Sequence, residues 1–121
     1  MPDIDADYVV VGAGAMGLAF TDALVDHSDA RVVVVDRREG VGGHWREAYS
    51  FVRLHQPSWF YGVASTPFGG RLQATGPEAG LHERASQAEV LAYFDDVLER
   101  LAATGRVDFW PGSEHADGAV V

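Results

Sequence analysis

Ala6-Asp-Tyr-Val-Val-Val-Gly-Ala-Gly-Ala-Met-Gly17 is the stretch of sequence that decides the fold of this chain. Its first half is a short run of β-branched apolar residues, which predicts a strand buried on both faces, as in a parallel sheet. Its second half matches the pattern G-x-G-x-x-G and leads into a predicted helix over residues 15–27. A glycine-rich turn between a strand and a helix is therefore the first structural expectation.

The predicted helix and the run Arg31-Val-Val-Val-Val-Asp36 complete a strand–helix–strand unit over residues 6–36. Such a crossover is right-handed and makes the two strands parallel. Asp22 and Asp26 lie outside the predicted apolar stripe of the helix, which consists of Leu18, Ala19, Ala23 and Leu24. We therefore expect an α/β fold, a Rossmann-like βαβ unit with a parallel sheet.

Each glycine of the motif has a physical task. Gly12 permits the turn out of the strand, Gly14 lets a diphosphate approach the backbone, and Gly17 allows the helix to pack closely. The helix N-terminus adds free N–H groups and a partial positive charge. Asp36, nineteen residues after Gly17, stands where a carboxylate accepts hydrogen bonds from ribose and repels a 2′-phosphate. The motif predicts a dinucleotide site and leaves both NAD and FAD open.

Composition excludes several other classes of function. The net charge is −9, from 18 acidic and 9 basic residues, which does not suit nucleic-acid binding. There is no cysteine, no G-x-S-x-G elbow, and no paired ligand spacing among the five histidines, so we expect no disulfide, serine-hydrolase or metal site. No apolar run approaches the length of a membrane span. A soluble cytoplasmic protein is the expectation.

Residues 37–85 are predicted to be irregular, because aromatic residues, glycine and proline occur there without sustained periodicity. Ser86-Gln-Ala-Glu89 is a capping box that should open a helix ending near Gly105. The residues expected to face inward from that helix are Val90, Tyr93, Phe94, Val97, Leu98 and Leu101.

A third strand is predicted over Val107–Trp110, since this apolar run is stopped by Pro111-Gly112. Asp117-Gly118 predicts a turn, and a further strand is expected to begin at Ala119.

Asp36-Arg-Arg-Glu-Gly-Val-Gly-Gly-His-Trp45 resembles the segment after the second strand in flavin-dependent monooxygenases of the flavin-containing and Baeyer–Villiger types. There, a ribose-binding acid precedes a Gly-Gly-x-Trp run. Tyr49-Ser-Phe-Val-Arg-Leu-His-Gln-Pro-Ser58 is similar to their next segment, which has an aromatic residue, an arginine and a Pro-Ser pair near the flavin. The helix from Ser86 and the strand from Val107 also fit the order of their FAD domain.

The resemblance implies FAD as the cofactor, with NAD(P)H as co-substrate of the full-length relative. By position, the diphosphate would be contacted by Gly12, Ala13, Gly14, Ala15, Met16 and Gly17. Asp36 and Arg37 would lie by the adenosine. The path towards the isoalloxazine would be lined by Gly42, Gly43, His44 and Trp45. His55 would lie near the flavin and nicotinamide, and no catalytic residue is assigned.

Such an enzyme also needs a nicotinamide-binding unit, but the sequence holds no second G-x-G-x-x-G. We therefore expect residues 1–121 to be the N-terminal portion of an FAD-binding domain, an incomplete three-layer sandwich whose partner is the missing remainder of the enzyme. Two other hypotheses stay open. The chain could be a stand-alone, non-catalytic nucleotide-binding module, or a Rossmann unit of the NAD-dependent dehydrogenase type.

Overall fold

The computed structural model describes residues 5–48, 53–54, 62–68, 73, 75, 77, 79–81, 84–113, 115–116 and 119–120. Within them the chain forms two α-helices, one 3₁₀ helix and five strands. In order these are β1 (Tyr8–Val11), α1 (Ala15–His27), β2 (Val32–Val35), η1 (Gly43–Glu47), α2 (Gln87–Ala102), β3 (Val107–Trp110), β4 (His115–Ala116) and β5 (Ala119–Val120).

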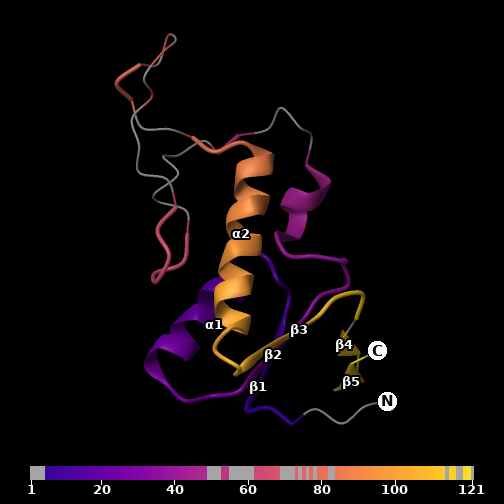
Figure 1. Ribbon diagram of the computed structural model, residues 1–121. Helices are drawn as coiled ribbons and strands as arrows, with labels where there is room; N and C mark the ends of the chain where they lie inside the picture. Colours follow the sequence, from indigo (N-terminus) through magenta and orange to yellow (C-terminus); the bar gives the residue numbers. More distant parts are fainter. Residues whose placement is uncertain are drawn as a thin grey trace.

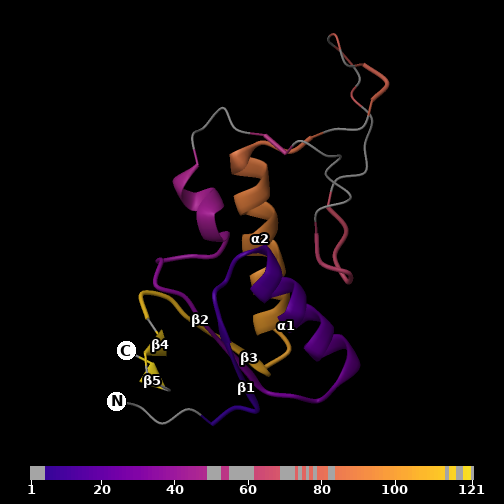
Figure 2. The same cartoon turned by 180° about the vertical axis from the view of Figure 1, so that it is seen from behind.

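The three longer strands form one parallel sheet in the order β1-β2-β3. Tyr8, Val32 and Val107 are aligned at one end of the sheet, and Val11, Val35 and Trp110 are aligned at the other. Both views show α1 and α2 on one side of this sheet and the antiparallel β4–β5 hairpin on the other (Figures 1 and 2). The predicted α/β class, with a parallel Rossmann-like sheet, is thus confirmed.

The core lies between the sheet and the two helices. All four valines of β2 are at most 4% exposed, so this central strand, which lies between β1 and β3, is buried on both faces. The inward face of α2 consists of Val90, Tyr93, Phe94, Val97 and Leu101, as predicted, whereas Leu98 is only partly buried. The capping box at Ser86 and Glu89 is present, and it fixes where α2 begins.

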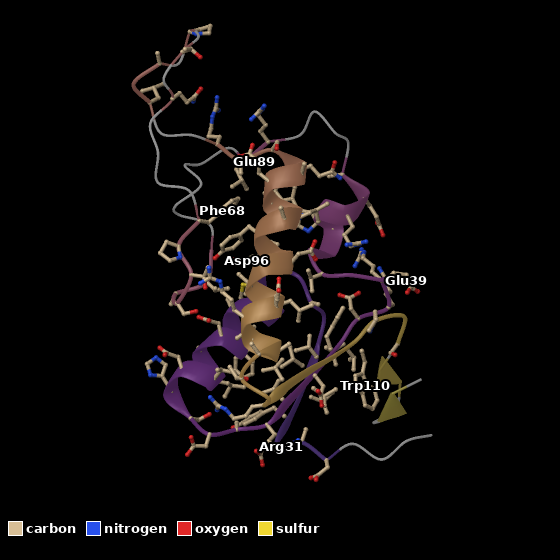
Figure 3. All side chains as sticks on the ribbon, viewed as in Figure 1. Arg31, Glu39, Phe68, Glu89, Asp96 and Trp110 are labelled. Atoms are coloured by element: carbon tan, nitrogen blue, oxygen red, sulfur yellow. The ribbon has the colours of Figure 1, made fainter. Side chains whose placement is uncertain are left out.

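The prediction that the first strand is buried on both faces is wrong for β1. Val10 is 8% exposed and faces the helices, whereas Tyr8, Val9 and Val11 are all exposed. In the described part of the chain β1 is the last strand of the sheet, with a strand on only one side. Trp110, on β3 at the other edge of the sheet, lies on the side of the β4–β5 hairpin (Figure 3).

The predicted apolar stripe of α1 is confirmed at Leu18, Ala19 and Leu24, which are buried or packed against the core, and is wrong at Ala23 and Asp22. Ala23 is exposed, whereas Thr21 and Asp22 are 0% and 4% exposed. Asp22 is buried because it accepts hydrogen bonds from the backbone N–H (3.1 Å) and the hydroxyl of Ser65. Thr21 donates its hydroxyl to the carbonyl of Gly17 at 2.8 Å. Asp22 therefore attaches this helix to residues 62–68.

Residues 62–68 are also attached to α2. The buried Tyr93 hydroxyl donates to the Thr66 carbonyl and accepts from the Val63 N–H at 2.9 Å. The Tyr93 ring stacks on Phe68 with 4.3 Å between ring centroids, and Figure 3 shows Phe68 beside α2. Burial raises the pKa of the Tyr93 hydroxyl. These contacts join both helices to a segment for which the sequence showed no periodicity.

At the C-terminal end of the chain, the strand predicted to begin at Ala119 is present as β5. It pairs with β4, a partner strand that the sequence did not indicate. The predicted turn at Asp117-Gly118 lies outside the described residues.

Candidate functional site

The first glycine turn links β1 to α1. At two of its three glycines, the backbone conformation or the packing of the protein itself requires glycine. Gly12 has a φ of +102°, which favours glycine, and its N–H donates to the Val35 carbonyl at 2.8 Å. A Cβ on Gly17 would lie 1.9 Å from the Gly12 carbonyl oxygen. The strand and the helix can therefore approach as closely as they do only with glycine at position 17.

Gly14 differs from the other two. It has an ordinary extended conformation, with φ −86° and ψ −166°, and it is the N-cap of α1. A Cβ there would come no nearer than 3.5 Å to another atom, the Gly43 Cα, which is ordinary van der Waals contact. No feature of the described protein therefore demands glycine at position 14. Space is left for a ligand that approaches the backbone.

The N-terminus of α1 is suited to a negatively charged group. No side chain caps it, so the first N–H groups of the helix are not satisfied from within it. The first turn of the helix also carries no acidic residue that would compete with an anion. Aligned peptide dipoles give this end roughly half a positive charge. Such an end attracts an anion through backbone N–H groups and needs no positive surface, which suits a chain of net charge −9.

Asp36 connects the end of β2 to this turn. Its carboxylate is 5% exposed; Oδ2 accepts from the Ala13 N–H and Oδ1 from the Arg38 N–H, each at 2.8 Å. Asp36 therefore fixes the backbone of the glycine turn directly, a role that the sequence did not indicate. Each carboxylate oxygen can accept more than one hydrogen bond, so these bonds leave acceptor capacity for a ribose hydroxyl.

A second glycine turn, Gly42-Gly43, packs against the first. The Gly42 N–H donates to the Ala13 carbonyl at 2.9 Å, so the peptide groups of Ala13 are held from both Asp36 and Gly42. Gly42 and Gly43 have φ values of +112° and +57°. A Cβ on Gly43 would lie 3.2 Å from the Gly14 Cα. The two turns therefore meet backbone to backbone, beside the N-terminus of α1.

The second turn continues into η1, which is fixed by α2. The Gln87 side-chain amide donates to the carbonyls of Trp45 and Ala48 at 2.7 and 2.6 Å. The Trp45 side chain is 8% exposed and belongs to the hydrophobic core. It also stacks with the exposed His44, at 5.8 Å between ring centroids. Trp45 therefore contributes to this region mainly by anchoring η1.

A depression of about 310 Å³ opens beside the first turn, at the carboxyl ends of β1 and β2. It is lined by Val11, Gly12, Val35, Asp36, Arg37, Arg38 and Ser113. The Arg38 guanidinium donates from Nε to Glu47 at 3.0 Å, which lowers the pKa of the Glu47 carboxyl and raises that of Arg38. Arg37 is exposed at the rim. Open α/β sheets bind ligands at this end of their strands.

The structure therefore brings most of the sequence-predicted positions together. The first turn, Asp36, Arg37 and the second turn share one end of the sheet, and the exposed Met16 lies on the first turn of α1. His55 lies outside the described residues. Sequence reasoning missed Ser113, whose N–H donates to the Asp36 carbonyl at 2.9 Å. The only local signal for it was the Pro111-Gly112 turn beside it.

The described residues offer neither a metal site nor a membrane span. No group of three or more His, Asp or Glu side chains in this part of the chain is arranged to hold a metal ion. Among the helices that the structure describes, none is both long enough and apolar enough to cross a membrane.

Comparison with known proteins agrees with this geometry. Residues 10–65, which include both glycine turns, match the family model of the NAD(P)-binding Rossmann-like domain. Uncharacterized proteins of Mycobacterium tuberculosis and Mycobacterium bovis are each 54% identical over 114 residues. The match covers 93% of this chain and 21% of each relative, so the chain spans about a fifth of their length.

Solved structures with the same fold include monooxygenases, one of them described as flavin-containing. A steroid monooxygenase bound to NADP is 28% identical with a TM-score of 0.63, over 90% of this chain and 20% of its own. A flavin-containing monooxygenase from Stenotrophomonas maltophilia is 22% identical with a TM-score of 0.66, over 95% of this chain and 32% of its own. The resemblance to this group is thereby confirmed.

Proposed function

We propose that this chain is the FAD-binding portion of an FAD-dependent, NAD(P)H-using oxidoreductase of the monooxygenase-like kind. The observation that carries the proposal is the contact of Gly14 with Gly43 beside the uncapped N-terminus of α1. Gly14 is partly exposed there and carries no side chain, whereas Gly42 and Gly43 are buried. A nucleotide diphosphate is the common ligand for which such an arrangement is suited.

The diphosphate would bind at the first turn through backbone N–H groups of Ala15, Met16 and Gly17, which begin α1. Gly14 allows its approach, since the nearest atom to a Cβ at this position is 3.5 Å away. Ala13 would stay fixed during binding because Asp36 and Gly42 hold its N–H and carbonyl. A turn that is already ordered loses little conformational entropy when the ligand arrives.

The adenosine would occupy the depression at the ends of β1 and β2. Asp36 would accept hydrogen bonds from the ribose hydroxyls with the lone pairs that the Ala13 and Arg38 N–H groups leave free. The exposed Arg37 would lie against the adenine or its ribose at the rim. A buried carboxylate at this place opposes a 2′-phosphate, which favours a nucleotide that carries none.

FAD is preferred to NAD on two grounds. Gly42-Gly43-His-Trp45 follows the ribose-binding acid as in flavin-dependent monooxygenases, and the structural relatives include a steroid monooxygenase and a flavin-containing monooxygenase. When bound, the flavin supplies the electron-transfer chemistry, and the protein supplies binding and orientation. In this proposal Gly42, Gly43 and His44 border the route from the diphosphate towards the flavin ring, and Gln87 keeps η1 in place.

The experiment is to purify the chain, record its visible absorption, and titrate nucleotide-free protein with FAD, NAD and NADPH. We expect flavin absorption in the purified protein, or saturable FAD binding seen as a rise in flavin fluorescence anisotropy. NAD and NADPH should bind at least about tenfold more weakly, a difference of 1.4 kcal/mol. Protein that binds NAD or NADPH while FAD does not compete would contradict the proposal.

An NAD-binding Rossmann unit is the second candidate, because the matching family model is described as NAD(P)-binding. Asp36 can accept hydrogen bonds from the adenosine ribose of NAD and of FAD equally well. The same titration separates the two functions, since an NAD-type unit would bind NAD in preference to FAD.

A further inference from the structure

The first residue of α2, Gln87, contacts the end of η1 with its side-chain amide. Its Nε2 lies 2.7 Å from the Trp45 carbonyl oxygen and 2.6 Å from the Ala48 carbonyl oxygen. An amide NH2 group carries two hydrogens, so both donors of this side chain are used. Carbonyls at the end of a helix need partners from elsewhere in the chain, and Gln87 supplies one for both.

Glutamine suits this position by its length and by its donors. The orientation of its amide follows from the contacts, because an amide oxygen in the place of Nε2 would face two carbonyl oxygens. Glutamate has the same shape but no donor when ionised, methionine has a similar length and no donor, and lysine reaches as far with three donors. Substitution at position 87 can therefore vary the donors while the length of the side chain is kept.

The start of α2 is itself firmly held, so Gln87 acts from a fixed support. The capping box of Ser86 and Glu89 fixes the first turn of the helix. Just before it, the Ala85 carbonyl accepts the Leu54 N–H at 3.0 Å, and Ala85 is fully buried. A side chain on such a support can determine where its partner lies.

One turn further along α2, Leu91 contacts the second glycine turn directly. A Cβ on Gly42 would lie 2.4 Å from Leu91 Cδ2, so the leucine side chain packs on the Gly42 backbone. Residues four apart share one face of a helix, and Gln87 and Leu91 therefore face η1 and the second turn together. Both views place η1 beside α2 (Figures 1 and 2). The helix holds this region at one polar and one apolar contact.

η1 begins directly at the second glycine turn and so connects Gln87 with the candidate nucleotide site. The Trp45 N–H donates to the Gly42 carbonyl at 3.1 Å, and the Gly42 N–H donates to the Ala13 carbonyl at 2.9 Å. A Cβ on Gly43 would lie only 3.2 Å from the Gly14 Cα. A shift of η1 therefore moves the second turn relative to the first.

We propose that Gln87 is a positioning residue of the nucleotide site. By placing η1 it sets how Gly43 lies against Gly14, and with it the affinity of the first turn for a diphosphate. Gln87 acts through η1 and not by touching the ligand. The inference rests on the proposed diphosphate site at the N-terminus of α1, and it adds a control of that site from α2. Its physical basis is that a site held in its binding geometry loses less conformational entropy when the ligand arrives.

The experiment measures the affinities of wild type, Gln87→Met, Gln87→Glu and Gln87→Lys for FAD by fluorescence anisotropy and for ADP by calorimetry. Urea denaturation first establishes a temperature at which each protein is folded. Gln87→Met and Gln87→Glu remove both donors, and each should weaken both ligands at least about fivefold, because the binding geometry of η1 is then only partly populated. Gln87→Lys keeps donors for the two carbonyls and should bind within about threefold of wild type.

This series separates positioning from the stability of α2. The positive N-terminal end of a helix favours glutamate and disfavours lysine, so helix stability alone ranks Gln87→Glu above Gln87→Lys, the reverse of the order expected for ligand affinity. Ala88→Glu is the matched control. Ala88 is exposed on the first turn of α2, so this variant adds the same charge beside Gln87 and keeps its amide. Its affinities should equal those of wild type.

Wild-type affinity in Gln87→Met would overturn the inference, as would a lower affinity in Gln87→Lys than in Gln87→Glu. If Gln87→Met and Gln87→Glu do not fold, Gln87→Asn replaces them, because its amide is one methylene too short for both carbonyls, and the same loss of affinity is expected. Wild type that binds neither FAD nor ADP would overturn the proposed function and this inference with it. Equal affinities of all variants in a wild type that binds would overturn this inference alone.

Discussion

The two glycine turns of this molecule look alike in sequence and differ in what holds them. The turn at residues 12–17 needs glycine for reasons within itself, since the strand ends at Gly12 and the helix passes close to it at Gly17, although Asp36 and Gly42 also hold its Ala13. The turn at Gly42-Gly43 is shaped by residues far along the chain, through the Ala13 carbonyl and the Gly14 backbone.

This difference teaches which glycines serve folding and which serve a ligand. Gly17 cannot carry a Cβ without moving the backbone, whereas Gly14 can. Gly43 is intermediate, because its φ is positive and its nearest neighbour, the Gly14 Cα, lies on the other turn. Substitution of these glycines should therefore separate loss of stability from loss of binding.

Gly17→Ala should have the largest effect on stability. Its Cβ would lie 1.9 Å from the Gly12 carbonyl, so α1 must move away from β1. We expect a loss of about 3 kcal/mol or more in the free energy of unfolding, which is at the upper end of the usual cost of inserting an extra carbon into a packed interior. Urea denaturation measures it. Gly12→Ala is the control, because its Cβ would meet nothing within 4 Å; if it costs as much as Gly17→Ala, strain rather than contact dominates.

Asp36→Ala should come next. It removes the acceptor of two backbone N–H groups, those of Ala13 and Arg38, and Ala13 is fully buried. Leaving such groups unpaired costs about 2–3 kcal/mol in total. Asp36→Asn keeps one acceptor and should cost less. The exposed Asp108→Asn is the control for loss of one negative charge, and an equal effect of that variant would show that Asp36 does not brace the turn.

Gly43→Ala should lower stability by about 1–2 kcal/mol, the cost of a left-handed conformation for a residue with a Cβ. It should also weaken FAD binding, since its Cβ would press on Gly14 at 3.2 Å. Gly105→Ala is the matched control. Its φ is +76° and its Cβ would meet nothing within 4 Å, so it should share the loss of stability and leave FAD affinity unchanged. Equal affinities of the two variants would show that the turns are not coupled.

The Arg38–Glu47 ion pair after β2 should have the smallest effect. The pKa of the Glu47 carboxyl is lowered in the folded protein, so its contribution is complete above the ordinary pKa of a glutamate and is lost as the pH falls through the folded value. The unfolding midpoints of wild type and Glu47→Gln should differ slightly at pH 7 and converge in acid or high salt. A difference in unfolding midpoint that grows as the pH falls would contradict a lowered pKa of Glu47 in the folded protein.

The sequence was sufficient wherever contacts are local. The four valines of β2, the start of α2 at Ser86 and the first glycine turn follow from neighbouring residues, and the structure has them as predicted. The burial of Asp22 in α1 did not follow, because its partner Ser65 lies 43 residues away. The hydrogen bonds of Ala13 with Asp36 and Gly42 were not predicted either, because they depend on how residues far along the chain fold back onto the first turn.

The exposure of β1 was missed for another reason. Its run of valines predicts burial on both faces, but burial depends on what lies beside the strand. In the described part of the chain a strand lies on one side only. A sequence pattern indicates the environment that a strand requires, and it does not indicate which polypeptide provides it.

The most direct test of the nucleotide site is calorimetric titration with ADP of wild type and Gly14→Ala. ADP carries the diphosphate, ribose and adenine and lacks the flavin. The free energy of unfolding of Gly14→Ala should stay within about 1 kcal/mol of the wild-type value, because the protein has room for a Cβ at this position. The variant should bind ADP at least about tenfold more weakly, because the ligand needs this position to be without a Cβ. The exposed helix variant Ala92→Gly, which should lose about 1 kcal/mol of stability and no affinity, controls for destabilisation. Unchanged ADP affinity in a folded Gly14→Ala protein would contradict a diphosphate site at this turn.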